Sequence, residues 1–103
     1  MYRYTTPTIP MSIEGLDFTL VNNFRIAIEQ DDKELYLFVV DADDPIVDAA
    51  ENTITLKLTQ EQTAKIREGF ARLQIRVVFN DGTVLATDKA IITIIDVIDE
   101  VIV

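Results

Sequence analysis

The segment RLQIRVVFNDGTVLA, residues 72–86, decides the fold predicted for this chain. In its first half, apolar side chains alternate with polar ones, a period of two that puts one kind on each face of a β-strand. The run Asn80-Asp81-Gly82-Thr83 then reverses the chain, because Asp-Gly is a strong signal for a tight hairpin turn. The return strand starts near Val84 and is expected to continue, past a bulge near Asp88-Lys89, along Ile91–Ile95.

Further strands are predicted upstream from the same kind of pattern. Pro7 and Pro10 suit a strand at a sheet edge, where a missing amide donor does no harm. The run from residue 35 to 40 is apolar throughout, which is typical of a strand covered on both faces. The strands expected before residue 59 are Thr8–Glu14, Phe24–Ile28, Leu35–Val40, a brief edge strand at Ile46–Val47, and Thr53–Leu58, with residues 16–20 either a short strand or an irregular crossing segment.

One short helix interrupts the strands. Thr59-Gln60-Glu61-Gln62 fits a capping box, in which Thr59 and Gln62 each bond the other's backbone amide. The helix is expected to end near Gly69. About seven short strands with one helical crossover predict an all-β fold, an immunoglobulin-like two-sheet antiparallel β-sandwich. Because the 103 residues hold no repeat and no linker, we expect residues 1–103 to form a single domain.

Composition excludes several classes of function. The chain carries 18 acidic against 9 basic residues, a net charge of -9, which repels nucleic acid and anionic membrane surfaces. Cysteine and histidine are absent and serine occurs once, at Ser12, so the usual nucleophiles, proton-transfer groups and zinc ligands are missing. We therefore expect no enzyme, no catalytic residue and no cofactor.

Targeting signals are also absent from the pattern. The first ten residues lack a basic start followed by an apolar run, so no signal peptide is expected. No stretch approaches the roughly 20 apolar residues that cross a bilayer. We expect a cytoplasmic chain, unless a larger assembly carries it out of the cell.

Two groups of carboxylates are candidate sites. Asp41, Asp43 and Asp44, with Asp48 nearby, offer the hard oxygen ligands that calcium prefers. Their spacing matches no calcium-binding loop, so a solvated acidic loop is the favoured interpretation. A glycosidase-like pair of Asp96 with Asp99 or Glu100 would need a cleft that a small sandwich seldom has, so an exposed, charged C-terminal stretch is favoured there.

The interface candidates lie at the two ends of the chain. Tyr2 and Tyr4 are expected to be exposed, where they suit a protein interface as well as a sugar. The C-terminal stretch is apolar between acids, and its interface candidates are Val97, Ile98, Val101 and Ile102. It either folds back on its own domain as a last strand or a helical turn, or it docks on a neighbouring subunit.

Three stretches carry a family resemblance: MYRYTTPTIP at the start, LTQEQTAKI in the middle and LQIRVVFNDGTVLATD after it. With them the chain resembles small proteins encoded by phages and prophages of Firmicutes, which are similar to the N-terminal β-sandwich of the phage baseplate upper protein. The baseplate protein carries further segments that attach receptor-binding proteins, so this chain is expected to match only the adaptor part. The motifs mark the hairpin and the crossover, not a ligand site.

The resemblance implies a non-enzymatic structural or accessory protein of a phage tail or baseplate. Its partners would be other particle proteins and a second copy of itself in a homo-oligomer, and its location the virion or the bacterial cytoplasm. The alternative is a cell-surface carbohydrate-binding module, assisted by calcium at Asp41, Asp43 and Asp44. A hydrolytic enzyme would require a cleft lined by carboxylates.

Overall fold

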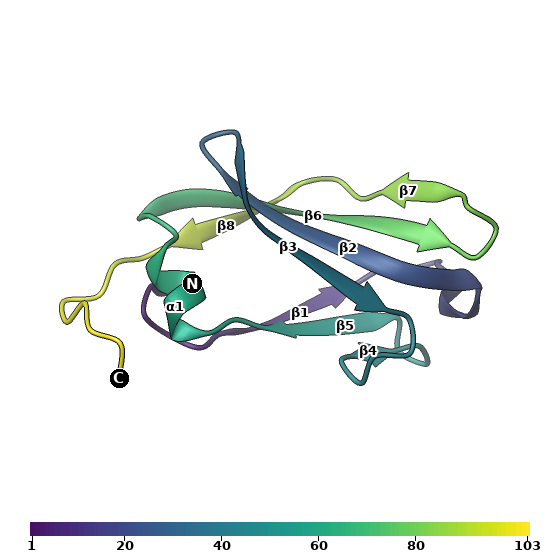
Figure 1. Ribbon diagram of the computed structural model, residues 1–103, viewed down its shortest axis with the longest axis horizontal. Coiled ribbons are helices and arrows are strands. Elements are labelled where there is room, and N and C mark those ends of the chain that lie inside the picture. The colour runs from purple at the N-terminus through teal and green to yellow at the C-terminus, as the bar shows by residue number, and fades with distance from the viewer.

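A computed structural model describes the whole chain, Met1–Val103, as two antiparallel sheets packed face to face (Figure 1). The three-stranded sheet has the order β1-β5-β4, with β1 at Thr8–Ser12, β5 at Thr53–Lys57 and β4 at Val47–Asp48. The five-stranded sheet begins with β3 (Lys33–Asp41), β2 (Val21–Gln30) and β6 (Gly69–Phe79). Its far edge is formed by β7 (Val84–Ala86) and β8 (Ala90–Ile94), both paired with β6. The predicted antiparallel β-sandwich is confirmed.

The strand order is that of an immunoglobulin-like domain. One sheet corresponds to the order B-E-D, and the other to C′-C-F-G with strand G divided into β7 and β8. The chain changes sheet between β1 and β2 through an irregular segment with one 3₁₀ turn, η1 (Phe18–Leu20). It changes sheet again between β3 and β4, and a third time between β5 and β6 through the helix α1 (Gln60–Ala64).

The core is built on the pairing of β2 with β6. Phe24 lies opposite Val77, and Ile26 and Ile28 lie opposite Ile75 and Leu73 in the same register. These side chains point inward because alternate residues of a strand share a face. Apolar residues of β1, β5 and the segments that follow them cover the row from the other sheet, giving one cluster of 16 buried residues. Each fully buried side chain of this size contributes about 1.5–3 kcal/mol.

The prediction that Leu35–Val40 is covered on both faces was wrong. Tyr36, Phe38 and Val40 face the core, but Leu37 and Val39 are 39% and 56% exposed on the outer face, and Leu35, at the bulge where the register with β2 shifts, is 37% exposed. The reason is that β3 lies at the edge of the sheet with nothing packed on its outer side. The three exposed residues are called the β3 stripe below.

The divided edge strand follows the sequence prediction. Between β7 and β8, Thr87 replaces the regular ladder: its amide donates to the carbonyl of Ile75 (2.9 Å), and its Oγ1 accepts from the amide of Ile75 (3.1 Å). The side chain of Gln74 donates to the carbonyl of Thr87 at 2.8 Å. The irregularity predicted near Asp88-Lys89 therefore lies at residues 87–89, and both halves stay paired with β6.

The helix is shorter than predicted. Its capping box is confirmed, since Thr59 Oγ1 accepts from the amide of Gln62 (3.2 Å) and Gln62 Oε1 accepts from the amide of Thr59 (2.9 Å). It ends at Ala64 and not near Gly69 because a side chain from another strand hydrogen-bonds the backbone of the residues that follow. Gln30 bonds both the amide and the carbonyl of Arg67, at 2.9 Å and 2.7 Å. Neither helix of the chain has the length and apolarity needed to cross a bilayer.

The turn between β2 and β3 generates a first prediction. Asp31 and Asp32 both have positive φ, 55° and 61°, as a two-residue type I′ turn requires, and Asn-Gly fits that turn best. Replacing the pair by Asn-Gly should stabilise the fold by about 1 kcal/mol in urea denaturation, because the left-handed backbone costs glycine least. As a control, Asp43→Gly in an exposed loop should lower stability by adding freedom to the unfolded chain. A loss of stability in the Asn-Gly variant would contradict the turn geometry.

The tyrosine on β3 generates a second prediction. Burial raises the pKa of the Tyr36 hydroxyl, which donates to the carbonyl of Gln62 at 2.9 Å. The folded state therefore holds this proton more tightly than the unfolded state, so stability should fall as the pH rises through the ordinary pKa of tyrosine. Urea denaturation at about pH 9 and about pH 11 measures the loss, which Tyr36→Phe should reduce. An equal alkaline loss in both proteins would contradict the assignment to Tyr36.

Candidate interaction surfaces

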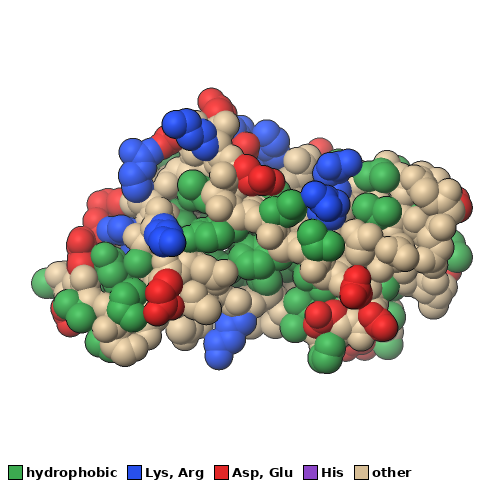
Figure 2. Space-filling model, viewed as in Figure 1, with side chains coloured by type: hydrophobic (Ala, Val, Ile, Leu, Met, Phe, Trp, Pro, Cys, Tyr) green, Lys and Arg blue, Asp and Glu red, His purple; other side chains and the backbone are tan.

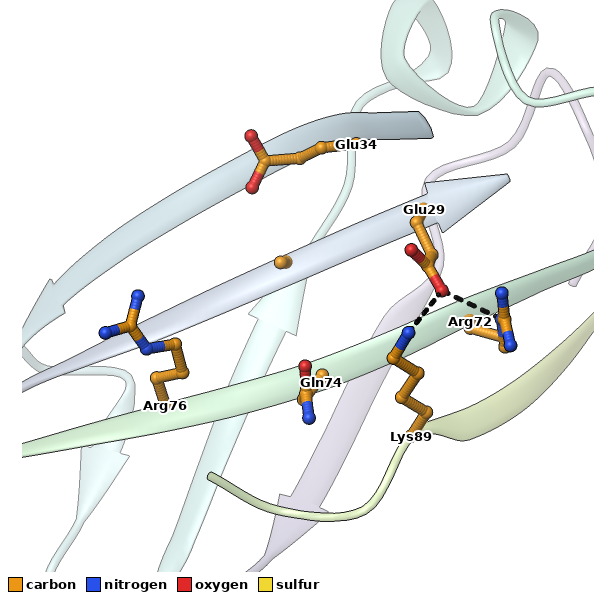
Figure 3. Close-up of a pocket in the computed structure, with 7 residues that line it drawn as sticks. Glu29, Glu34, Arg72, Gln74, Arg76 and Lys89 are labelled. Atoms are coloured by element: carbon orange, nitrogen blue, oxygen red, sulfur yellow. Dashed lines mark hydrogen bonds and ion pairs between the residues drawn. The ribbon is translucent and has the colours of Figure 1, made fainter. Parts of the chain in front are cut away.

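A charged pocket lies at the centre of the outer face of the five-stranded sheet. It holds about 220 Å³ and is lined by Ala27, Glu29, Glu34, Arg72, Gln74, Arg76 and Lys89. Glu29 accepts from Arg72 Nε at 2.8 Å and from Lys89 Nζ at 3.0 Å, and Figure 3 shows both cations converging on this one carboxylate. Arg72 also reaches Asp32 at 2.8 Å.

The pocket offers charge but little enclosure. Its volume of about 220 Å³ lies below the range of roughly 300–1,000 Å³ typical of ligand pockets. Arg76 and Glu34 line it from β6 and β3 and take part in no ion pair. The arrangement suits the polar part of a protein interface, because arginine side chains with unused donors are common there.

Apolar side chains flank this pocket on both sides. The β3 stripe lies along one edge of the sheet. Along the other edge, Phe70 lies opposite Thr93 of β8, and Ile91 is the next outward residue of that strand. Phe70 and Ile91 are each 70% exposed, and Ile95 and Tyr2, joined by a parallel bridge, extend the group. These four residues are called the β8 patch.

The two N-terminal tyrosines differ in exposure. Tyr2 is exposed, as predicted. Tyr4 is half-buried, so the expectation of exposure is wrong for it. Its backbone has a positive φ of 59°, and its ring lies 5.3 Å from the guanidinium of Arg3. The positive φ turns the chain after the first three residues, which run beside the end of β8.

Arg3 joins three segments and was not singled out from the sequence. Its side chain is only 15% exposed. It donates to the carbonyls of Ile66 and Ala64, each at 2.6 Å, and to Asp96 Oδ1 at 2.6 Å. The hydrogen bond to Asp96 is the largest influence that raises the pKa of Arg3. This one guanidinium therefore ties the N-terminal segment and the end of α1 to the start of the C-terminal stretch.

Residues 96–103, called the tail below, form neither a strand nor a helix. The side chain of Gln60 bonds both the carbonyl and the amide of Val103, at 2.7 Å and 2.8 Å. Val97 is half-buried, whereas Ile98, Val101 and Ile102 are exposed. The tail thus lies back against its own domain, but without the last strand or helical turn that the sequence left open, and most of its apolar side chains face outward.

The acidic loop does not gather a metal site. Asp44 Oδ1 accepts from the amide of Ile46 at 3.0 Å, which closes a turn before β4. No three acidic side chains of the chain form a group that could hold a metal ion, so Asp41, Asp43 and Asp44 are not brought together as calcium ligands. Asp96 and Glu100 both approach Arg3, at 2.6 Å and 3.7 Å.

Comparison of the chain with models of protein families, with curated proteins and with solved structures gives no match.

The contacts of Arg3 with three segments generate a third prediction. Arg3→Ala should lower the free energy of unfolding by about 2 kcal/mol, because two backbone carbonyls lose a charged donor. It should also speed amide hydrogen exchange in residues 96–103, since the ion pair to Asp96 is lost. Arg25→Ala is the matched control: Arg25 is half-buried on the outer face and makes no ion pair, so its loss should cost less than about 0.5 kcal/mol. Equal effects of the two substitutions would contradict the role of Arg3.

Proposed function

We propose that the chain is a non-enzymatic structural or accessory component of a phage-like particle, associated with the tail or baseplate, which acts through protein-protein contacts. One observation carries most of the support. The chain exposes 14 large hydrophobic residues, and 11 of them fall in three places: three in the β3 stripe, four in the β8 patch and four in the tail (Ile98, Val101, Ile102 and Val103). Grouped apolar exposure of this kind is typical of interaction surfaces.

The space-filling view supports the same proposal. Hydrophobic side chains are exposed along β3 and in the hollow between β3 and β5, with charged side chains of both signs above them around the β2–β3 turn (Figure 2). An apolar strip beside charged groups is the arrangement of a protein interface with a polar rim. The absence of histidine and cysteine and the shallow charged pocket agree with a binding role.

The phage-like setting rests on the resemblance of the sequence motifs, which fall on the elements that build the sandwich. LTQEQT, residues 58–63, directly follows β5 and covers the N-cap and most of α1. QIRV lies in β6, and DGTVLA forms the turn and β7. The location we propose is therefore the virion, with the bacterial cytoplasm before assembly.

A carbohydrate-binding module is the less supported alternative. Sugar sites use exposed aromatic rings beside a groove, but none of the four surface cavities is lined by an aromatic side chain. Tyr2 and Phe70 supply exposed rings on the β8 patch. Binding of a cell-wall glycan that is lost in Tyr2→Ala with Phe70→Ala would favour this alternative.

Particle purification tests the proposed function. Particles from an induced lysogen that carries the gene are separated on a density gradient, and the chain is quantified against a capsid protein by mass spectrometry. We expect a constant ratio of the chain to the capsid protein across the particle peak, because a bound component sediments with its assembly. An abundant cytoplasmic enzyme of the host is the control. A chain that stays at the top of the gradient with this enzyme would contradict the proposal.

A further inference from the structure

The open edge of β3 is the longest unpaired strand edge in the fold. β3 has nine residues and is the terminal strand of the five-stranded sheet. On the same side of the sandwich, the other sheet ends in β4, which has only two residues (Figure 1). An exposed row of amide and carbonyl groups is a template for a further strand, and an apolar edge without a covering element strengthens that tendency.

The side chains of β3 would accept an apolar strand on both of its faces. Leu37 and Val39 of the β3 stripe line the outer side, and Tyr36 and Phe38 are only half-buried on the inner side. A strand added to β3 would cover the stripe with one set of alternate side chains and the aromatic pair with the other.

The tail has the composition of such a strand. Valine and isoleucine supply five of its eight residues, and these β-branched residues favour strands. When the tail is extended, Val97, Val101 and Val103 fall on one face and Ile98 and Ile102 on the other. Ile98 and Val103 are 105% and 90% exposed, so the apolar side chains gain little from their present position.

Charge favours the same pairing. Beyond Asp96, which is paired with Arg3, the tail carries Asp99 and Glu100. Beside the start of β3, a cavity of about 350 Å³ is lined by Gln30, Asp31, Lys33, Leu35, Lys65 and Arg67. Arg67 pairs with Asp31, while Lys33 and Lys65 take part in no ion pair. In a chain of net charge -9, this basic spot at the β3 edge is complementary to the acidic tail.

The tail of the same molecule cannot occupy the edge. It leaves β8, which lies three strand positions from β3 in the order β3-β2-β6-β8. A strand added outside β3 lies one position farther, four strand spacings or about 19 Å from β8, which takes at least about six residues of extended chain. This crossing would use residues 96–101, so a tail that pairs along β3 through Val97, Ile98 and Val101 comes from another molecule.

We propose that the tail of one copy adds as a strand to the β3 edge of a second copy. This inference rests on the proposed assembly function and names one of its partners, a second copy of this chain. The contact is heterologous, since the tail of one copy meets the edge of the next, and it produces a ring or an open series of copies.

Sedimentation velocity across a concentration series tests the proposal. The full chain should associate, and a chain that ends after Asp96, which keeps the ion pair to Arg3, should stay monomeric. Leu37→Lys should also stay monomeric, because a lysine on an edge strand blocks pairing. Val39→Lys, at a position that is 56% exposed, repeats the test if the first substitution disturbs folding. Ile91→Lys, the same kind of apolar-to-lysine change on the β8 patch, should associate like the unchanged protein.

The decisive sample is a mixture of the two monomeric variants. The truncated chain keeps an open β3 edge and Leu37→Lys keeps a tail, so one copy of each should form a dimer that grows no further. About 0.5 M salt should weaken this dimer by about tenfold or more, because it screens the charges of the tail and the basic spot. Monomeric behaviour of the unchanged chain at all concentrations, or a mixture without dimers, would overturn the inference.

The two proposals fail separately. A chain that sediments with particles but never self-associates would remain a particle component and would lose the tail-to-edge contact. Association of the truncated chain to the same extent as the full chain would place the contact on another surface and would also overturn the inference. A dimer in the mixture combined with absence from particles would remove the particle function alone.

Discussion

The structure depends on the pairing of β2 with β6. Phe24, Ile26 and Ile28 meet Val77, Ile75 and Leu73 in one register, and a slip of one residue would turn every one of these side chains outward. The other strands take their positions from this pair: β3 and the β7–β8 edge flank it in the sheet, and the three-stranded sheet covers its inner face. No disulfide assists, since the chain has no cysteine. Apolar burial therefore carries the stability.

Sequence reasoning predicted the elements whose signals are local. Alternation located β2 and β6, the Asp-Gly turn located the hairpin to β7, and the spacing of Thr59 and Gln62 located the start of α1, because each signal lies within a few neighbouring residues. The exposure of the β3 stripe was not predicted, because a continuous apolar run has the same sequence pattern in a central strand and in an edge strand.

The hydrogen bonds that buried polar side chains make to distant segments were not predicted, for a related reason. Arg3 bonds residues that lie 61 to 93 positions away. Thr63 is fully buried, and its Oγ1 accepts from the amide of Thr5 and donates to the carbonyl of the same residue. Gln30 is buried at the end of β2, where it bonds Arg67. A buried polar side chain is stable only when the fold brings it a partner, and no pattern within one segment shows that partner.

The pairing of residues 1–3 with the end of β8 affects how the domain responds to a pulling force. Residues 1–3 run parallel to the end of β8, held by three hydrogen bonds: the terminal ammonium of Met1 to Thr93 (2.7 Å), Ile95 to Met1 (2.8 Å) and Arg3 to Ile95 (3.0 Å). A force that pulls the two ends of the chain apart slides these segments past each other. The three hydrogen bonds then bear the load together. If the segments were peeled apart, the bonds would bear it one after another. A domain tethered at both ends thus resists tension at its outermost contacts before the sheets separate.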